Sequence, residues 1–293
     1  MTIQINNLEV NAPPLAAATV MVMRDGPQGL EVLMIQRHHN SDVLGGAHVF
    51  PGGKLDAQDS QLNGLVPDRP LDWFQARLAE PETPADLALA LHLAALRETL
   101  EESGLLIGQT VQADQLQQAR QQLGEKQGFT SVLNNLGLPL RTQGLAPWSR
   151  WVTPRMPSVM TKRFDTRFFV AIAPPEQLAL HDNFEATETV WLNPRQGLHD
   201  YWEGRIGLAP PQIMSLSQLA RFENAASALA YAEKSRPVLT QPEPFDDNGV
   251  RVICYPGDPR HSNPEPGFEG PTRLRFVNKR FEPEGGLAAL LPS

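Results

Sequence analysis

The chain has few of the features that mark secreted or membrane-bound proteins. It contains one cysteine, Cys254, which excludes an internal disulfide framework and is typical of a reducing compartment. No stretch approaches the run of about 18 apolar residues that a membrane span needs. Residues 1–14 contain neither a basic segment nor a long apolar run, so no signal peptide is predicted. We therefore expect a cytoplasmic protein with no membrane partner, in which Cys254 is a core or incidental residue.

Positive charge is also scarce. Lys and Arg together number 25 against 33 Asp and Glu, which gives a net charge of −8. This balance argues against a general nucleic-acid binder and against binding to an anionic membrane surface. With 41% hydrophobic and 20% charged residues, the composition is that of an ordinary globular protein. The expected partner is instead a small molecule.

An unusual acidic helix end stands out from this background. Residues 85–96 are rich in Ala and Leu, which predicts a helix, and Gly104 is placed to end it. Glu98, Glu101 and Glu102 share one face of its last turns, where like charges and the helix dipole both destabilise it. Clustered carboxylates are ligands for Mg²⁺ or Mn²⁺. The alternative is a solvated acidic face, but the apolar residues 105–107 follow directly and a Gly-Gly turn lies upstream.

At these residues the chain resembles the Nudix hydrolase family. The family box has a glycine, five residues, a glutamate, seven residues and then R-E-aliphatic-x-E-E-x-G-aliphatic. Gly53 corresponds to the first glycine, and the second half corresponds to residues 97–105, RETLEESGL. Two positions depart from the box: Thr99 replaces the aliphatic residue, and Asp59 replaces the early glutamate, with Asp56 as a second candidate.

The box is also split. Residues 60–96 are 37 positions where the family has seven, so 37 − 7 = 30 residues are inserted. In having a split box, the chain resembles the branch of the family that contains coenzyme A diphosphatases. The segments 148–154 and 162–169 also resemble this branch.

The resemblance implies roles for the residues of the box. Glu98, Glu101, Glu102 and the backbone of Gly53 would hold Mg²⁺ or Mn²⁺, and Glu101 or Glu102 would also act in catalysis. Arg97 would orient the carboxylates by ion pairing, supported by Asp59. The catalytic base is not fixed in this family. By position, Glu185 and Glu188 are candidates, and exposed acids at a strand edge are the equally good alternative.

Substrate recognition is predicted from a local excess of basic residues. Only Asp165 opposes five of them, and three aromatic residues lie within or beside the group. The basic residues are Arg150, Arg155, Lys162, Arg163 and Arg167, and the aromatic residues are Trp148, Trp151 and Phe164. These side chains could bind phosphates and stack on an adenine. Alternatively, the aromatic rings belong to the core and the bases pair with surface acids.

A few further polar residues lie near the expected site. Arg37 ends a predicted strand there and could also meet phosphate. His38, His39 and His48 have no ligand-like spacing, so structural or surface roles are favoured.

The pattern along the chain predicts an α/β Nudix fold, with a mixed sheet between helices. Residues 60–84 are the insertion and should cover the acidic helix, while 109–145 form a helical segment of the same domain, 1–205. Residues 206–293 form a helical, proline-rich extension that packs on this domain or on a second subunit, so a homodimer is plausible.

The predicted elements are strands at 15–24, 31–36, 168–172, 187–192, 250–255 and 273–281, and helices at 71–79, 113–124, 128–136, after 193 and twice within 211–234.

The sequence thus favours metal-dependent hydrolysis of a nucleoside diphosphate derivative, with coenzyme A or acyl-CoA first. Cleavage of ADP-ribose, NADH or dinucleoside polyphosphates is the enzymatic alternative. A non-catalytic nucleotide sensor and a structural interaction protein are the alternatives of other classes.

Overall fold

The structure is a computed structural model that describes residues 6, 8–38, 45–158, 162–180 and 186–292. Its main sheet is mixed and has the strand order β3-β2-β1-β6-β5-β8, while β4 pairs with β1 and β7 pairs with β2. β1 and β6 run parallel, as do β5 and β8, and the other pairs are antiparallel. The strands are β1 (Leu15–Gly26), β2 (Gly29–Arg37), β3 (His48–Val49), β4 (Gly52–Lys54), β5 (Leu145–Val152), β6 (Phe164–Ile172), β7 (Ala186–Leu192) and β8 (Val238–Thr240).

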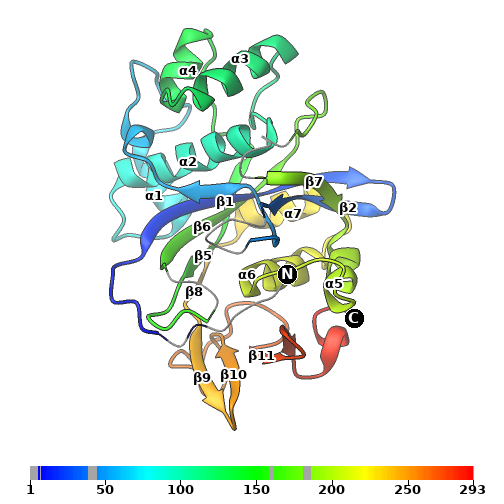
Figure 1. Cartoon of the computed structure of the whole chain (residues 1–293). Coiled ribbons are helices and arrows are strands. Elements are labelled where there is room, and N and C mark those ends of the chain that lie inside the picture. The colour runs from blue at the N-terminus through cyan, green and yellow to red at the C-terminus, as the bar shows by residue number, and fades with distance from the viewer. Residues whose placement is uncertain (1–5, 7, 39–44, 159–161, 181–185, 293) are drawn as a thin grey trace.

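Helices cover both faces of this sheet (Figure 1). One face carries α1 (Leu71–Leu78), α2 (Ala85–Ser103), α3 (Ala113–Gly124) and α4 (Phe129–Asn135), together with the short 3₁₀ helix η1 (Ala57–Ser60). The other face carries α5 (Pro194–Trp202), α6 (Pro210–Leu219) and α7 (Ala225–Lys234). The mixed sheet between helices that the sequence predicted is therefore present.

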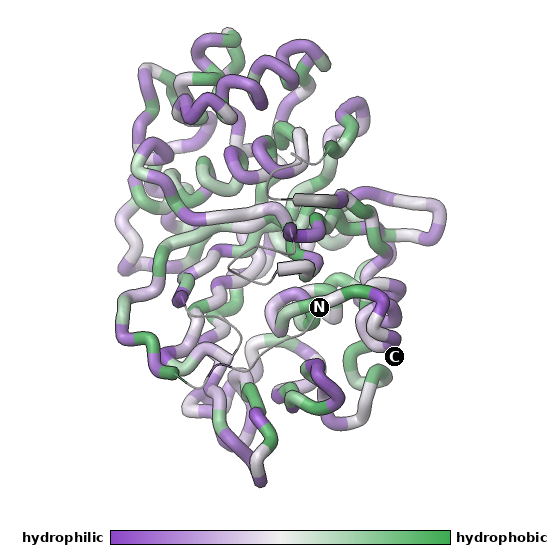
Figure 2. Tube along the Cα trace, in the orientation of Figure 1, coloured by the Kyte–Doolittle hydropathy of each residue, from purple (hydrophilic) through white to green (hydrophobic). Residues whose placement is uncertain are grey.

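The alternation of side chains along β1 creates two separate cores. Ala18, Val20 and Val22 pack on the α2 face, whereas Met21 and Met23 pack on the opposite face. All five are fully buried, because neighbouring residues of a strand point to opposite sides of the sheet. Figure 2 shows that hydrophilic residues dominate the outermost helix α3, which has one face in solvent.

The insertion covers the acidic helix as expected. Phe74 and Leu78 of α1 are buried in the same core as the apolar residues of α2, and Trp73 packs against that core. α2 itself ends at Gly104, whose φ of +72° is the left-handed conformation that glycine adopts without strain.

The C-terminal extension adds a strand to the main sheet and a second, four-stranded sheet. β8 pairs with β5, a contact that the proline-rich sequence did not predict. The second sheet contains β9 (Glu243–Asp247), β10 (Val250–Cys254), β11 (Arg273–Val277) and β12 (Arg280–Pro283), followed by the 3₁₀ helix η2 (Gly286–Ala289). Cys254 is buried in β10, and burial raises the pKa of its thiol to about 11. The strand predicted at 250–255 is confirmed as β10. The single strand predicted at 273–281 is instead a hairpin of β11 and β12, because Asn278 and Lys279 at positive φ reverse the chain between them. The strands β8 and β9 were missed.

Candidate functional site

Two of the three glutamates of α2, Glu98 and Glu102, lie against the Gly-Gly turn at β4. The backbone N–H of Gly52 donates a hydrogen bond of 2.7 Å to Oε2 of Glu102. A Cβ on Gly53 would stand 2.3 Å from Oε1 of Glu98, so only glycine leaves room for that carboxylate. Register places Gly53 opposite Ala18 of β1, which ties this turn to the sheet. Two halves of the split box are thus brought together across the insertion.

Arg97 is the centre of the polar contacts at this site. Its Nη1 donates to Glu98 at 2.9 Å and to Glu101 at 3.0 Å. Its Nε and Nη2 donate to the two oxygens of Asp59 at 2.8 and 2.9 Å. The guanidinium therefore orients the carboxylates from one side while Asp59 holds it from the other, which are the contacts the sequence led us to expect.

The residues around Asp59 hold this arrangement in place. Asp59 belongs to η1, and its Oδ2 accepts a hydrogen bond from the backbone N–H of Asp56. Asp56 in turn caps η1 through the N–H of Gln58, so it has a structural contact of its own and does not touch Arg97. Thr99, at the position where the family has an aliphatic residue, is buried and donates its hydroxyl to Ala95 O. Its polarity is thus satisfied within the helix.

The site carries more negative charge than its one buried cation offsets. Burial raises the pKa of Glu98 to about 7, with Arg97 opposing the rise and Glu101 adding to it. Burial also raises the pKa of Glu101, again against Arg97. The pKa of Arg97 is raised above its ordinary value, because its acidic partners outweigh the effect of burial. Hard oxygen donors with elevated pKa values suit a divalent cation, which would supply the missing positive charge.

In this structure, the described carboxylates of the site are not spaced as the ligands of a metal ion. Within the described ranges, no group of three or more His, Cys, Asp or Glu side chains is arranged to hold a metal ion. Glu98 and Glu101 both point an oxygen at Arg97 instead. The donor types fit a metal, and ligation by all three glutamates requires their side chains to turn.

We expect Gly53→Ala to impair turnover while the protein stays folded. The new methyl group would displace the end of the Glu98 side chain, and a displacement of about 1 Å at a catalytic site costs roughly 10²-fold in rate. Steady-state turnover and thermal unfolding would be measured together. Gly124→Ala is the matched control, because a Cβ there meets nothing within 4 Å. Full activity of Gly53→Ala would show that the position of Glu98 does not matter.

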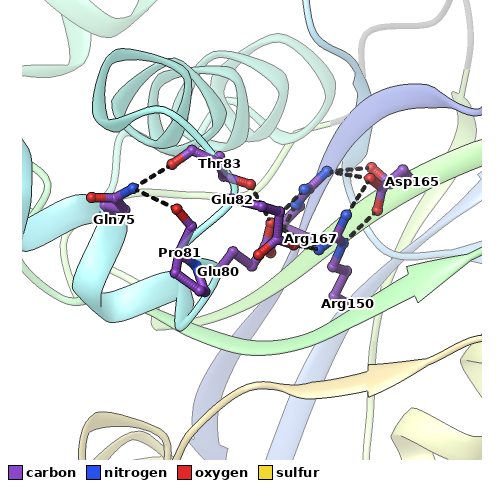
Figure 3. A network of polar contacts seen from close by, with 8 residues as sticks. All are labelled: Gln75, Glu80, Pro81, Glu82, Thr83, Arg150, Asp165 and Arg167. Atoms are coloured by element: carbon purple, nitrogen blue, oxygen red, sulfur yellow. Dashed lines mark hydrogen bonds and ion pairs between the residues drawn. The ribbon is translucent and has the colours of Figure 1, made fainter.

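The structure corrects the predicted basic patch. Arg167 is only 5% exposed in its side chain and donates two hydrogen bonds to Glu80, at 3.1 Å from Nε and 2.5 Å from Nη2. Arg150 donates to Asp165 from Nε and Nη2, at 2.9 Å each, and to Glu82 at 2.8 Å. Figure 3 shows these side chains as one network between the insertion and the strands β5 and β6. Arg150 and Arg167 therefore pair with acids, as the alternative from the sequence held, although Glu80 is buried and is not the surface acid that this alternative assumed. Neither arginine is open to a phosphate.

The other basic residues of the patch lie apart from this network. Arg155 and Lys162 are exposed, and Arg163 is half-buried. Arg163 donates to the carbonyl oxygens of Thr153 and Ala12. Its interactions with the described residues include no ion pair, so its charge is the one in the former patch that is both partly buried and not neutralised.

Trp151 also proves to be a core residue. It is 6% exposed and packs against Phe168, Tyr255 and Phe268 on the face of the sheet opposite α2. Together with Trp148 it lines a cavity of about 680 Å³ on that face. Phe164 is half-buried at the start of β6. Stacking of Trp151 on a substrate held by the α2 glutamates is excluded by the intervening sheet.

The remaining candidates lie along β2 and its neighbours. Arg37 ends β2, is half-buried, and its Nε is buried without a hydrogen-bond partner among the described residues. Glu188 lies opposite Gln36 in the sheet. It is two residues from Val190 on the same strand, so both side chains point to the same face of the sheet, and Val190 packs on the α5 face. Glu188 therefore points away from α2, which is the wrong side for a catalytic base. Glu185 and His39 lie outside the described residues.

The histidines have structural positions. His48 is buried beneath α5, where burial lowers the pKa of its imidazole while Glu188 and Asp200 act in the opposite direction. Its backbone N–H donates to Gly207 O. His38 is exposed at the end of β2. Neither the position of His48 nor that of His38 suits a metal ligand, as the sequence favoured.

Comparison with known families now adds to this geometry. The family model of the NUDT19 Nudix domain matches residues 68–219, which is more than half of the chain. The chain belongs to this Nudix family. The matched range contains the helix with Arg97 and the glutamates, whereas Gly53 and Asp59 precede it. The protein is therefore a Nudix hydrolase.

Individual relatives extend the similarity over most of the chain. The acyl-coenzyme A diphosphatase NUDT19 of Xenopus laevis is 27% identical over 78% of this chain and 72% of its own length. The protein of the same name from Gallus gallus is 27% identical over 81% of this chain and 76% of its own.

A solved structure shares the fold. The crystal structure of a Nudix hydrolase from Alicyclobacillus acidocaldarius has a TM-score of 0.61 and 26% identity, and it covers 78% of this chain and 99% of its own. The predicted Nudix fold is thus confirmed. Nudix hydrolases generally need a divalent metal. No helix within the described ranges has both the length and the apolar character to cross a membrane.

Proposed function

We propose that the protein hydrolyses the diphosphate linkage of coenzyme A or an acyl-CoA with Mg²⁺ or Mn²⁺. The observation that carries this proposal is the intact acidic face of α2, gathered by Arg97 against Gly52 and Gly53. The substrate class is supported by similarity to relatives named acyl-coenzyme A diphosphatase. The expected products are 4′-phosphopantetheine, or its acyl form, and adenosine 3′,5′-bisphosphate.

We propose separate roles for the residues that bind the cation and for those that position the carboxylates. Glu98, Glu101, Glu102 and the carbonyl of Gly53 would hold the cation. When bound, such a cation neutralises charge on a diphosphate and acidifies a water molecule. The N–H of Gly52 fixes Glu102, and Arg97 fixes Glu98 and Glu101, so the carboxylates start from defined positions. Burial raises the pKa of Glu98 to about 7, so this carboxyl can carry a proton at neutral pH, and a bound cation would favour its ionised form.

Substrate contacts beyond the metal site fall to fewer residues than the sequence suggested. Of the arginines predicted to bind substrate, Arg37 and Arg163 form no ion pair with a residue that the structure describes, whereas Arg167 is held by Glu80. We leave the catalytic base unassigned, since Glu188 lies on the other face of the sheet.

The assembly and cellular context are part of the same proposal. We propose a nucleotide-derived substrate with no nucleic-acid partner, a cytoplasmic location and a homodimer, together with the division into residues 1–205 and 206–293. Light scattering would test the dimer.

A substrate screen tests the proposed function. We expect coenzyme A or an acyl-CoA to be cleaved fastest with Mg²⁺ or Mn²⁺, and EDTA to abolish cleavage because no protein side chain replaces the cation. Product masses identify the bond that breaks. Faster cleavage of ADP-ribose, NADH or a dinucleoside polyphosphate would overturn the substrate assignment. Binding without cleavage of any of these compounds would indicate a sensor instead of an enzyme.

A further inference from the structure

The turn between α3 and α4 lies against the element that supports the catalytic arginine. A Cβ on Gly128 would stand 2.7 Å from Oε1 of Gln58 in η1, so the side chain of Gln58 packs directly against this glycine. The amide of Asn63 donates to the hydroxyls of Thr130 and Ser131 at 2.9 Å each. Thr130 donates in turn to the carbonyl of Gln61 at 2.5 Å. These contacts fix the position of residues 126–131 relative to η1.

η1 leads directly to the acidic site. Its Asp59 binds Arg97 at 2.8 Å, and Arg97 binds Glu101 at 3.0 Å. Lys126 lies two residues before Gly128, which contacts Gln58, the residue next to Asp59. The positive charge of Lys126 lowers the pKa of Glu101, although burial raises that pKa more strongly. Glu101 is the more open of the two glutamates that Arg97 holds, with 32% of its side chain exposed. The lysine therefore stands at the solvent side of the catalytic carboxylates.

The local backbone and the neighbouring side chains leave the Lys126 ammonium available. Lys126 has a φ of +65°, and its N–H donates to Leu123 O at 2.8 Å, which closes a tight turn after α3. The adjacent Glu125 is occupied, because the amides of Gln121 and Gln127 donate to its two oxygens. No ion pair or side-chain hydrogen bond within the described ranges involves Lys126, and its side chain is exposed. A charge held beside a reaction site without a partner suits an anionic ligand.

We propose that Lys126 binds a phosphate oxygen of the substrate, so that the α3–α4 turn forms part of the substrate site. This proposal rests on the proposed diphosphatase activity. It gives the helical segment that follows α2 a role in recognition, in place of Arg150 and Arg167, two of the five basic residues from which the sequence predicted phosphate binding. A lysine ammonium supplies a point charge and three donors, which suits phosphate oxygens in several orientations.

Lys126→Ala tests the proposal through the separation of KM from kcat. We expect KM for the diphosphate substrate to rise about tenfold, the factor that one charge-assisted hydrogen bond contributes, while kcat stays unchanged. Lys126→Arg should recover most of the loss, and Lys126→Glu should enlarge it. Lys279→Ala is the matched control, because Lys279 is also exposed at positive φ, 63°, in a turn of the second sheet. Unchanged KM in Lys126→Ala, or an equal rise in Lys279→Ala, overturns the proposal.

The same experiment distinguishes this proposal from the proposed function. If the wild type cleaves another diphosphate faster than coenzyme A, the substrate assignment fails and the Lys126 variants are compared on that other compound. If the wild type cleaves none, calorimetry with ADP and Mg²⁺ replaces kinetics. Weaker ADP binding by Lys126→Ala than by the wild type then supports the role of Lys126, whereas equal binding, or no binding by either protein, contradicts it.

Discussion

Glu101→Gln is expected to lower metal-dependent turnover by about 10³-fold, which corresponds to the loss of roughly 4 kcal/mol of transition-state stabilisation from one metal ligand. Glutamine keeps the size of the side chain and its ability to accept a hydrogen bond from Arg97 at 3.0 Å, but it removes the negative charge. Steady-state kinetics with Mg²⁺ and with Mn²⁺ measure the effect. Circular dichroism and thermal unfolding should show a folded protein.

Glu102→Gln removes the negative charge of a proposed metal ligand while keeping the hydrogen bond that holds this side chain in place. Glu102 is 4% exposed and accepts the Gly52 N–H at 2.7 Å, and glutamine can still accept that bond. We therefore expect the same loss of turnover with an intact fold. Glu233→Gln on α7 is the matched control, since this residue is exposed on the other side of the sheet. Normal turnover in both Glu101→Gln and Glu102→Gln would refute the site.

The acidic helix could be predicted from the sequence because its evidence is local. The spacing of Glu98, Glu101 and Glu102 fixes their common face, and Gly104 fixes the helix end, whatever packs around them. The position of Gly53 needed the family resemblance, since the insertion separates it from α2. The mixed sheet and most helices likewise followed from short apolar patterns.

The substrate side could not be predicted because it depends on contacts between distant segments. Glu80 neutralises Arg167 from 87 positions away, and nothing near Arg167 in the sequence indicates this partner. Trp151 lies on a strand, β5, that the sequence did not predict, so the face it occupies could not be inferred. Lys126, which we propose to bind phosphate, lies in a polar turn without a motif. The contacts of Gln58 and Asn63 that bring this turn to η1 join segments far apart in the sequence.

The network around Glu80 should be as important for stability as the glutamates are for turnover. Glu80 and Arg167 are 7% and 5% exposed in their side chains, and Glu80 also lies 3.1 Å from Nη1 of Arg150. It also accepts a hydrogen bond from the hydroxyl of Thr83, which lies in the last part of the insertion, just before α2 (Figure 3). Glu80 thus fastens the inserted segment to β5 and β6 near the start of α2, at the opposite end of this helix from Glu98, Glu101 and Glu102.

Glu80→Ala is expected to destabilise the protein by about 3 kcal/mol, the lower end of the cost of leaving a buried charge without its partner. The lower end applies because Asp165 still lies 3.0 Å from Arg167. Denaturant unfolding measures the change, and Glu82→Ala is the control, because that carboxylate is mostly exposed and should matter little. In Glu80→Ala, the buried Arg167 loses its main partner. The double variant Glu80→Leu/Arg167→Met removes this arginine charge as well, so it should recover much of the stability. If Arg167 instead served a substrate phosphate, this double variant would raise KM; we expect KM to stay unchanged, because the pair holds the insertion in place and does not contact the ligand.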